Sequence, residues 1–266
     1  MKITSLQNPK IKDAVKLRER KDREATQQFL IEGYRELKRA VDAGRNVHTL
    51  FFCPEFFLGE NERALIEEAG GEAIECSPEV FAKISYRDRP DGLLAVAPQV
   101  HETLFGLERL LKPTPFLIIA ESIEKPGNLG TILRSADAAG VDAVIVCDPT
   151  TDIHNPNVVR SSVGTLFTVP VIEATSTETL EFLKQRSIAI VAATPHAQLE
   201  FTDANFQVPL AVAVGTEQYG LTEEWMQKAD IQVRIPMFGV ADSLNVASAT
   251  TLVLYEVVRQ RKPRRH

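Results

Sequence analysis

Residues that could perform chemistry gather near the end of the chain, in IPMFGVADSLNVASATTLVLYE, residues 235–256. The segment leaves an apolar strand at Ile235 and brings Asp242, Ser243 and Asn245 to the first turn of a predicted helix. Asp and Ser are favoured at helix N-termini, where backbone N–H groups lack partners inside the helix. The segment is therefore either an ordinary capped helix or a loop that presents its N–H groups to a ligand.

A second segment of this kind, PGNLGTILRSADAAG, covers residues 126–140 and follows the apolar strand FLIIA. Asn128 is the predicted N-cap of its helix, and Gly140 stands where a C-terminal glycine belongs. Arg134 falls just beside the apolar stripe of this helix. The arginine could therefore face a ligand, or it could form a surface ion pair with Asp137, one helical turn further on.

A third segment, LAVAVGTEQYGLTEEW, residues 210–225, runs from a buried-type strand directly into Gly215 and Glu217. Loops with glycine and polar residues at the carboxyl ends of apolar strands are where an open α/β sheet binds its ligand. Neither GxGxxG nor GxxxxGK[ST] occurs in the chain, which disfavours a dinucleotide enzyme and a P-loop nucleotide triphosphatase. Three such loops predict a ligand site of another kind.

In order along the chain, the three segments resemble the signature motifs of the SpoU/TrmH family of RNA ribose 2′-O-methyltransferases, members of the SPOUT superfamily. NVVRSSVGTLFTVPV, residues 157–171, is similar to the family's middle segment, and the resemblance covers residues 115–260. Thr216 and Asn157 depart from the residues common in the family. The first hundred residues resemble, more loosely, the substrate-binding domain that many such enzymes carry.

The resemblance implies a methyltransferase that uses S-adenosyl-L-methionine (SAM), forms a homodimer and carries a C-terminal trefoil knot. It implies an RNA substrate, with ribosomal RNA favoured over transfer RNA because a separate N-terminal domain suits a structured RNA element. The cofactor-binding positions that it implies are Thr194, Gly215, Ile235 and Leu244. The catalytic positions that it implies are Arg134, Asn128, Glu217, Ser243 and Asn245.

Methylation of a ribose 2′-hydroxyl requires that the two reacting atoms are aligned and that the oxygen becomes more nucleophilic. A guanidinium stays protonated in proteins, so we interpret Arg134 as a fixed positive charge that stabilises the developing alkoxide. Glu217 is expected to orient Arg134, while Ser243 and Asn245 would hydrogen-bond the ribose or shape the cofactor loop. Glu217 could instead be only a loop acid, and Asn128 only a helix cap.

Two other functions stay open at this point. One is a catalytically silent RNA-binding protein that keeps the knot, and the presence of Arg134, Glu217 and Asn245 speaks against it. The other is a SPOUT enzyme that methylates a base, which the position of the methyl group after nuclease digestion would reveal.

The composition fits an ordinary globular protein of two domains, with 266 residues, 44% of them hydrophobic and 25% charged. The start has no apolar signal segment, and no apolar run approaches the length of about 18 residues that indicates a membrane span. We therefore expect a cytoplasmic protein that does not enter a membrane. The three cysteines form no CxxC pair and the five histidines are dispersed, so no metal site is expected.

The net charge of −6 argues against a surface that binds polyanions everywhere. Positive charge is concentrated at the two ends. Residues 1–23 hold eight Lys or Arg residues against three acids, and RQRKPRRH, residues 259–266, holds five basic residues and no acid. Such runs are compatible with phosphate contacts, or they are simply solvated basic segments.

The predicted fold is α/β: a small N-terminal α/β RNA-binding domain over 1–98, a linker over 99–115, and a mostly parallel-sheet SPOUT domain over 116–266. Strands are predicted at 29–31, 48–53, 72–76 and 93–97, and then at 116–120, 143–147, 167–171, 188–193, 209–214 and 231–235. Helices are predicted at 8–22, 33–43, 60–70 and 78–84, and then at 129–139, 177–186, 222–228 and 243–260.

Overall fold

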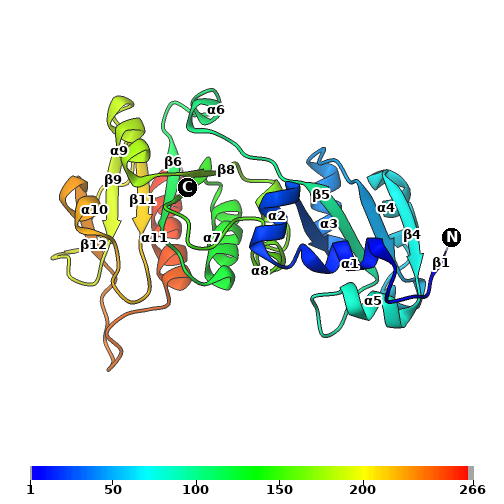
Figure 1. Ribbon diagram of the computed structural model, residues 1–266. Coiled ribbons are helices and arrows are strands. Elements are labelled where there is room, and N and C mark those ends of the chain that lie inside the picture. Colours follow the sequence, from blue (N-terminus) through cyan, green and yellow to red (C-terminus); the bar gives the residue numbers. More distant parts are fainter. Residues whose placement is uncertain (1, 263–266) are drawn as a thin grey trace. The chain divides into compact units, whose positions relative to one another are not determined.

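The computed structural model describes residues 2–262, so Arg264 and Arg265 of the basic tail lie outside the described residues. The chain divides into two compact units (Figure 1). The N-terminal unit consists of Met1–Val100 with Asp152–Thr168, and the C-terminal unit of His101–Thr151 with Val169–His266. Segment 152–168 falls within the predicted second domain, yet it packs with the first unit. The domain boundaries along the chain stay a prediction.

The N-terminal unit is built on a mixed sheet with the strand order β1-β4-β3-β5-β2. Strand β4 pairs in parallel with β1 and β3, whereas β5 pairs antiparallel with β2 and β3. The strands are β1 (Lys2–Ile3), β2 (Gln28–Glu32), β3 (Thr49–Phe52), β4 (Glu72–Cys76) and β5 (Leu93–Pro98). The helices are α1 (Pro9–Lys16), α2 (Arg20–Thr26), α3 (Tyr34–Asp42), η1 (Pro54–Phe56), α4 (Glu62–Ala69), α5 (Pro78–Ile84), α8 (Pro156–Ser161) and η2 (Thr165–Phe167).

Segment 152–168 joins this unit through buried contacts. Arg23 is 1% exposed, and its guanidinium donates to the Asp152 carboxylate at 2.7 Å. The Phe29 ring lies 4.6 Å from the ring of His154. A buried charge is stable only when it is paired, so the pairing of Arg23 with Asp152 fixes this segment against α2.

The C-terminal unit contains, within the described residues, a seven-stranded sheet in the order β10-β12-β9-β11-β6-β7-β8, and every pairing in it is parallel. The strands are β6 (Phe116–Glu121), β7 (Ala143–Cys147), β8 (Val171–Ala174), β9 (Ala189–Ala193), β10 (Leu199–Glu200), β11 (Leu210–Val214) and β12 (Ile231–Arg234). The helices are α6 (Leu104–Glu108), α7 (Pro126–Ala139), α9 (Ser176–Gln185), α10 (Glu223–Lys228) and α11 (Val246–Arg261). The expected α/β class with a mostly parallel sheet is confirmed.

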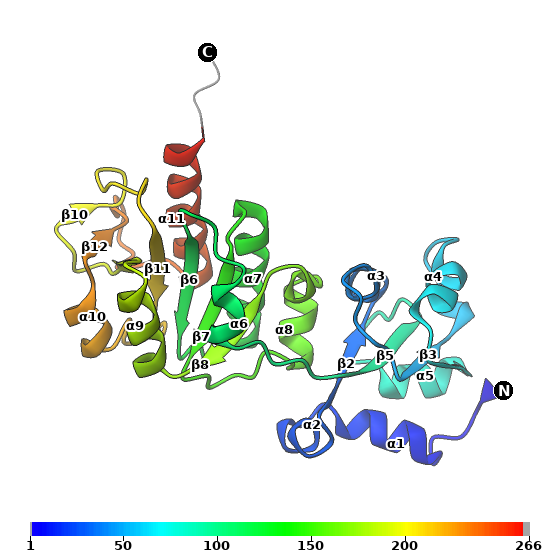
Figure 2. The same ribbon diagram turned by 90° about the horizontal axis from the view of Figure 1, so that it is seen from above.

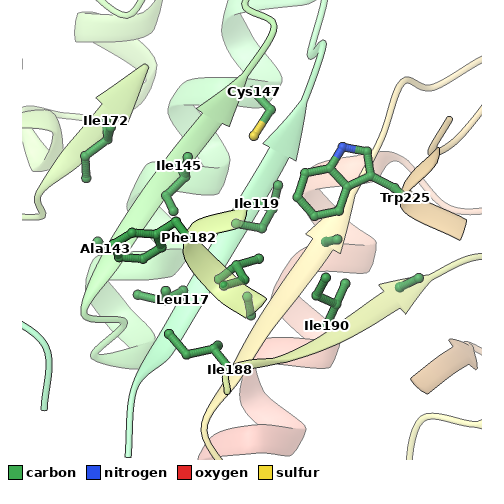
Figure 3. Packing of buried hydrophobic residues seen from close by; sticks show 14 of the residues in the cluster. Leu117, Ile119, Ala143, Ile145, Cys147, Ile172, Phe182, Ile188, Ile190 and Trp225 are labelled. Carbon is green, nitrogen blue, oxygen red and sulfur yellow. The ribbon is translucent and has the colours of Figure 1, made fainter. Parts of the chain in front are cut away.

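Helices cover both faces of this sheet, with α7 and α11 on one face and α9 and α10 on the other (Figure 2). On the α9 and α10 side, the fully buried Trp225 lies beside Ile119 in the core (Figure 3). The indole Nε1 of Trp225 donates to Ser176 Oγ at 2.8 Å. This bond fixes α10 to the start of α9 and so positions the loop that precedes α10.

One predicted strand is wrong. The strand expected at 167–171 is β8, Val171–Ala174, and the residues before it form η2 instead. Val163 and Gly164 have φ angles of 54° and 80°, so the chain turns there and cannot extend until Pro170 has passed. The short helix α8 was not predicted.

Two helix starts also differ from the prediction. Helix α7 begins at Pro126, because a proline at the first helical position has its φ angle already set, and Asn128 therefore lies inside the first turn and is not the N-cap. Helix α11 begins at Val246, and Asn245 caps it by accepting from the Ala247 N–H at 3.0 Å. Ser243 consequently lies in the preceding loop. No helix within residues 2–262 is long and apolar enough to cross a membrane.

Candidate active site

Three of the predicted cofactor positions follow the carboxyl ends of adjacent parallel strands. Thr194 comes directly after β9, Gly215 after β11 and Ile235 after β12. Strand β9 lies between β11 and β12, with Ala192 opposite Ala213 and Ala193 opposite Val233. The three positions therefore meet at one edge of the sheet, where open α/β folds bind ligands.

The loop between β12 and α11, residues 235–245, is irregular. Within the described chain, no backbone N–H from 235 to 244 donates a hydrogen bond to the protein. Apolar side chains also project from this loop, with Phe238 96% and Leu244 39% exposed. Free backbone groups beside apolar side chains suit a ligand with an aromatic base and a sulfonium group, because they bind it without adding charge. The residues present therefore fit SAM.

The loop after β11 is tight and closed on itself. Thr216 and Gly220 exchange two backbone hydrogen bonds, both of 3.0 Å. A Cβ atom at Gly215 would overlap the carbonyl of Gly220, so only glycine fits at this position. Beyond the turn, the buried Glu121 accepts from the N–H of Thr222 at 2.9 Å and from its hydroxyl at 2.7 Å. Glu121 thus fixes the far end of the loop to the end of β6.

Glu217 stands on this loop and joins the three sequence motifs. One of its oxygens accepts from Asn128 and, at 3.1 Å, from Asn245 Nδ2, and the other accepts from the ammonium of Lys125. Asn245 Nδ2 also lies 3.1 Å from Asn128 Oδ1. The first turns of α7 and α11 therefore meet at one carboxylate, where the positive ends of two helix dipoles favour a negative charge.

The Glu217 carboxylate is held in its charged form. The hydrogen bond from Lys125 lowers the pKa of Glu217 below its usual value, and the bond from Asn128 acts in the same direction. A carboxylate with a lowered pKa and several donors around it is a poor proton acceptor. Through these bonds the carboxylate joins its loop to the starts of α7 and α11.

Arg134 lies on α7 with an exposed side chain. Within residues 2–262 it makes no hydrogen bond and no ion pair, so the expected contact with Glu217 is wrong, as is the alternative ion pair with Asp137. Glu217 pairs with Lys125 instead. On the buried side of the same helix, Ser135 Oγ lies 2.7 Å from Thr251 Oγ1 and holds α7 against α11.

Of the remaining candidates, Ser243 is exposed in the loop before α11 and makes no hydrogen bond to another described residue. Leu244 is half-exposed beside it. Sequence reasoning missed Lys125 and Glu121. A lysine directly before the PGN motif was a usable signal for the first, whereas nothing local indicated that Glu121 at a strand end would receive two bonds from Thr222.

Comparison with known proteins shows the family of the chain. Residues 115–255 match the model of the SpoU rRNA Methylase family. The chain belongs to this family. Residues 8–95 match the MRM3-like substrate binding domain. The chain is 33% identical to the 23S rRNA (uridine(2479)-2′-O)-methyltransferase of Streptomyces viridochromogenes over 242 residues. This match covers 88% of this chain and 83% of that protein.

Solved structures are similar over nearly the whole chain. A crystal structure of an RNA 2′-O ribose methyltransferase is 43% identical with a TM-score of 0.87 and covers 98% of this chain and 99% of its own. The crystal structure of an AdoMet-bound rRNA methyltransferase from Sinorhizobium meliloti is 30% identical with a TM-score of 0.88 and covers 99% of both chains.

Proposed function

We propose that this chain is a SAM-dependent methyltransferase that modifies a ribose 2′-hydroxyl of ribosomal RNA. The observation that carries the proposal is the junction of three sequence motifs at Glu217. Arg134, on the same helix as Asn128, is exposed and has no partner among residues 2–262. The substrate class follows from the relative in Streptomyces viridochromogenes, and the cofactor from the AdoMet-bound structure.

The cofactor supplies an activated methyl group on a positively charged sulfur. The strand-end residues Thr194, Gly215 and Ile235, together with Leu244, would hold it. Gly215 keeps the 216–220 turn closed, and the 235–245 loop offers backbone groups and apolar side chains. This arrangement would orient the cofactor's methyl group toward the hydroxyl that it methylates.

Arg134 would act on the RNA side of the reaction. The new O–C bond would form as the bond between methyl and sulfur breaks, and the hydroxyl proton would pass to water. A fixed guanidinium would stabilise the negative charge that develops on the oxygen. Because Arg134 has no partner among the described residues, its donors are available to the alkoxide and to a neighbouring phosphate. Asn128, Glu217 and Asn245 would position the two helix starts, and Ser243 would contact the ribose.

The homodimer and the trefoil knot belong to the same proposal, as does action in the cytoplasm, where ribosomal RNA is accessible. Support for the dimer comes from apolar side chains that the C-terminal unit exposes. Phe238 is 96%, Val240 104% and Tyr255 48% exposed. Surfaces of this kind are covered in stable assemblies.

The test is methyl transfer from labelled SAM to ribosomal RNA, followed by nuclease digestion and separation of nucleosides. We expect the label in a 2′-O-methylnucleoside. Label in a methylated base would show base methylation instead. Absence of label, together with intact RNA binding, would leave a silent RNA-binding protein.

A further inference from the structure

The N-terminal unit contains a cavity that the proposed chemistry does not use. Its volume is about 800 Å³, and it is bordered by the start of α3, the loop before α4, the 87–91 loop and α8. Ligand pockets commonly range from about 300 to about 1,000 Å³. A single nucleotide can therefore enter it.

The rim of the cavity is positively charged. Arg35, Arg89 and Arg160 line it with exposed side chains, and none of the three guanidinium groups makes a hydrogen bond or ion pair within the described chain. The exposed Asp88 is the rim's counter-charge, which leaves an excess of two positive charges. Unpaired guanidinium groups from three separate elements suit a phosphate, which they can bind through two parallel hydrogen bonds.

The interior is lined by three carboxylates, Glu36, Glu62 and Asp91, and by one guanidinium, Arg87, which pairs with Glu36 and Asp91. Glu62 and Asp91 are 4% and 8% exposed, and Glu62 Oε2 and Asp91 Oδ1 have no hydrogen-bond partner among the described residues. Their other oxygens are used: Glu62 Oε1 accepts from Gly59 N at 2.7 Å, and Asp91 Oδ2 from Tyr34 N at 2.9 Å. Buried acceptors without donors are costly, so a ligand that brings donors is favoured there.

Two apolar residues also line the cavity. Leu58 lines the cavity with 83% of its surface exposed, and Val163 lines it with a φ angle of 54°, which a β-branched residue rarely adopts. The strained turn places Val163 where its carbonyl accepts from Arg39. A flat aromatic base can rest on these side chains, as unpaired bases do on the apolar surfaces of RNA-binding proteins.

We propose that this cavity binds one unpaired guanosine of the RNA substrate, with phosphate on the arginine rim and the base inside. Guanine is the base whose Watson–Crick edge carries two adjacent donors, the N1–H and the 2-amino group. Those donors match the free oxygens of Glu62 and Asp91. Adenine presents an acceptor at N1, and uracil a single donor between two acceptors. The inference rests on the proposed function, to which it adds a determinant of RNA specificity.

The test measures binding of the full chain to a stem–loop RNA with one bulged guanosine, by fluorescence anisotropy. Matched RNAs carry adenosine, uridine or inosine at the bulge. We expect guanosine to bind roughly tenfold more tightly than adenosine or uridine, with inosine between them because it lacks the 2-amino donor. This comparison changes only the RNA, so protein folding does not affect it. Equal affinity for the guanosine and adenosine bulges would overturn the proposal.

Protein variants test the arginine rim and the carboxylates of the interior separately. Arg89→Gln and Arg160→Gln should each lower the affinity for all four bulged RNAs by a similar factor. Each should also make this affinity less dependent on salt concentration. Arg63→Gln is the matched control, because Arg63 is exposed on α4 outside the cavity lining. Glu62→Gln should remove the preference for guanosine. Rim variants that bind like Arg63→Gln would exclude the phosphate contact. SAM affinity and methyl transfer to ribosomal RNA, measured in parallel, test the proposed function separately.

Discussion

The carboxylates of the two units are in contrasting surroundings. In the C-terminal unit, Glu217 accepts from Lys125, Asn128 and Asn245, and the buried Glu121 accepts twice from Thr222. In the N-terminal unit, two buried carboxylates of the cavity each keep one oxygen without a donor, and three arginines on its rim have no acceptor among the described residues.

The difference is one of preorganisation: the polar groups around Glu217 and Glu121 are already paired, whereas several of those in the N-terminal cavity are not. The 216–220 turn at the end of β11 is already held by its own hydrogen bonds, so this loop needs little reorganisation when cofactor binds. The cavity is completed only when a ligand supplies the missing donors and charges. Arg134 is the exception in the C-terminal unit, since it alone of the candidate charged groups there has no partner among residues 2–262.

The largest effect on activity is expected from substitution of Arg134. Arg134→Ala should lower the methyl-transfer rate by roughly 10² or more, comparable to loss of one oxyanion donor. Arg134→Lys should retain measurable turnover, because an ammonium keeps the charge but not the planar fork. SAM affinity should change little in either variant. Single-turnover rates and calorimetric SAM binding are the measurements.

Two outcomes would contradict this role. Loss of SAM binding in Arg134→Ala would make the residue part of the cofactor site. Wild-type turnover in both variants would mean that the nucleophile is activated elsewhere, and Glu217 would be the next residue to examine.

Substitution of Glu121 should have an intermediate effect on stability and SAM binding, because Glu121 holds the loop before α10. Glu121→Gln places an amide N–H₂ against the two donors of Thr222, so at least one buried bond is lost. We expect about 1–3 kcal/mol of lost unfolding free energy and weaker SAM binding. Urea denaturation and SAM titration measure the two. Glu124→Gln, an exposed neighbour, is the control. A stable Glu121→Gln protein with unchanged SAM affinity would show that Glu121 does not order the loop.

Local pattern predicts the strand ends well, and the reason is physical. Apolar runs identify β9 and β11, because a strand buried on both faces has to be apolar throughout, and Gly215 marks the end of β11. Parallel strands then bring their carboxyl ends to one edge without further information. The sequence therefore predicts one edge of the sheet for Thr194, Gly215 and Ile235, which the family resemblance names as cofactor positions, whereas the strand order that makes them neighbours comes from the structure.

Long-range pairing could not be predicted in the same way. Lys125 and Glu217 are 92 residues apart, and their contact depends on where the 216–220 turn lies against α7. The N-terminal cavity exists because segment 152–168 packs against β2, so Arg160 joins Arg35 only in the folded unit. The two predicted helix starts were wrong for a local reason. Pro126 begins α7 before the residue predicted as its cap, and Asn245 caps α11 after the residues predicted as its caps.

The smallest effect should come from titration of Glu217. Hydrogen bonds from Lys125 and Asn128 lower its pKa in the folded chain. The stabilisation is therefore complete above the pKa of the unfolded chain and is lost as pH falls through the lower, folded value. Because Lys125 is largely exposed, the charge pair contributes at most about 1 kcal/mol. Melting temperatures of wild type and Glu217→Gln should therefore differ at neutral pH and converge as the pH falls below the lowered pKa of Glu217 in the folded chain. Glu224→Gln, which removes an exposed acid of α10, should show no such convergence. A difference that stays constant with pH would mean that Glu217 stabilises the loops through the shape of its side chain and not through its charge.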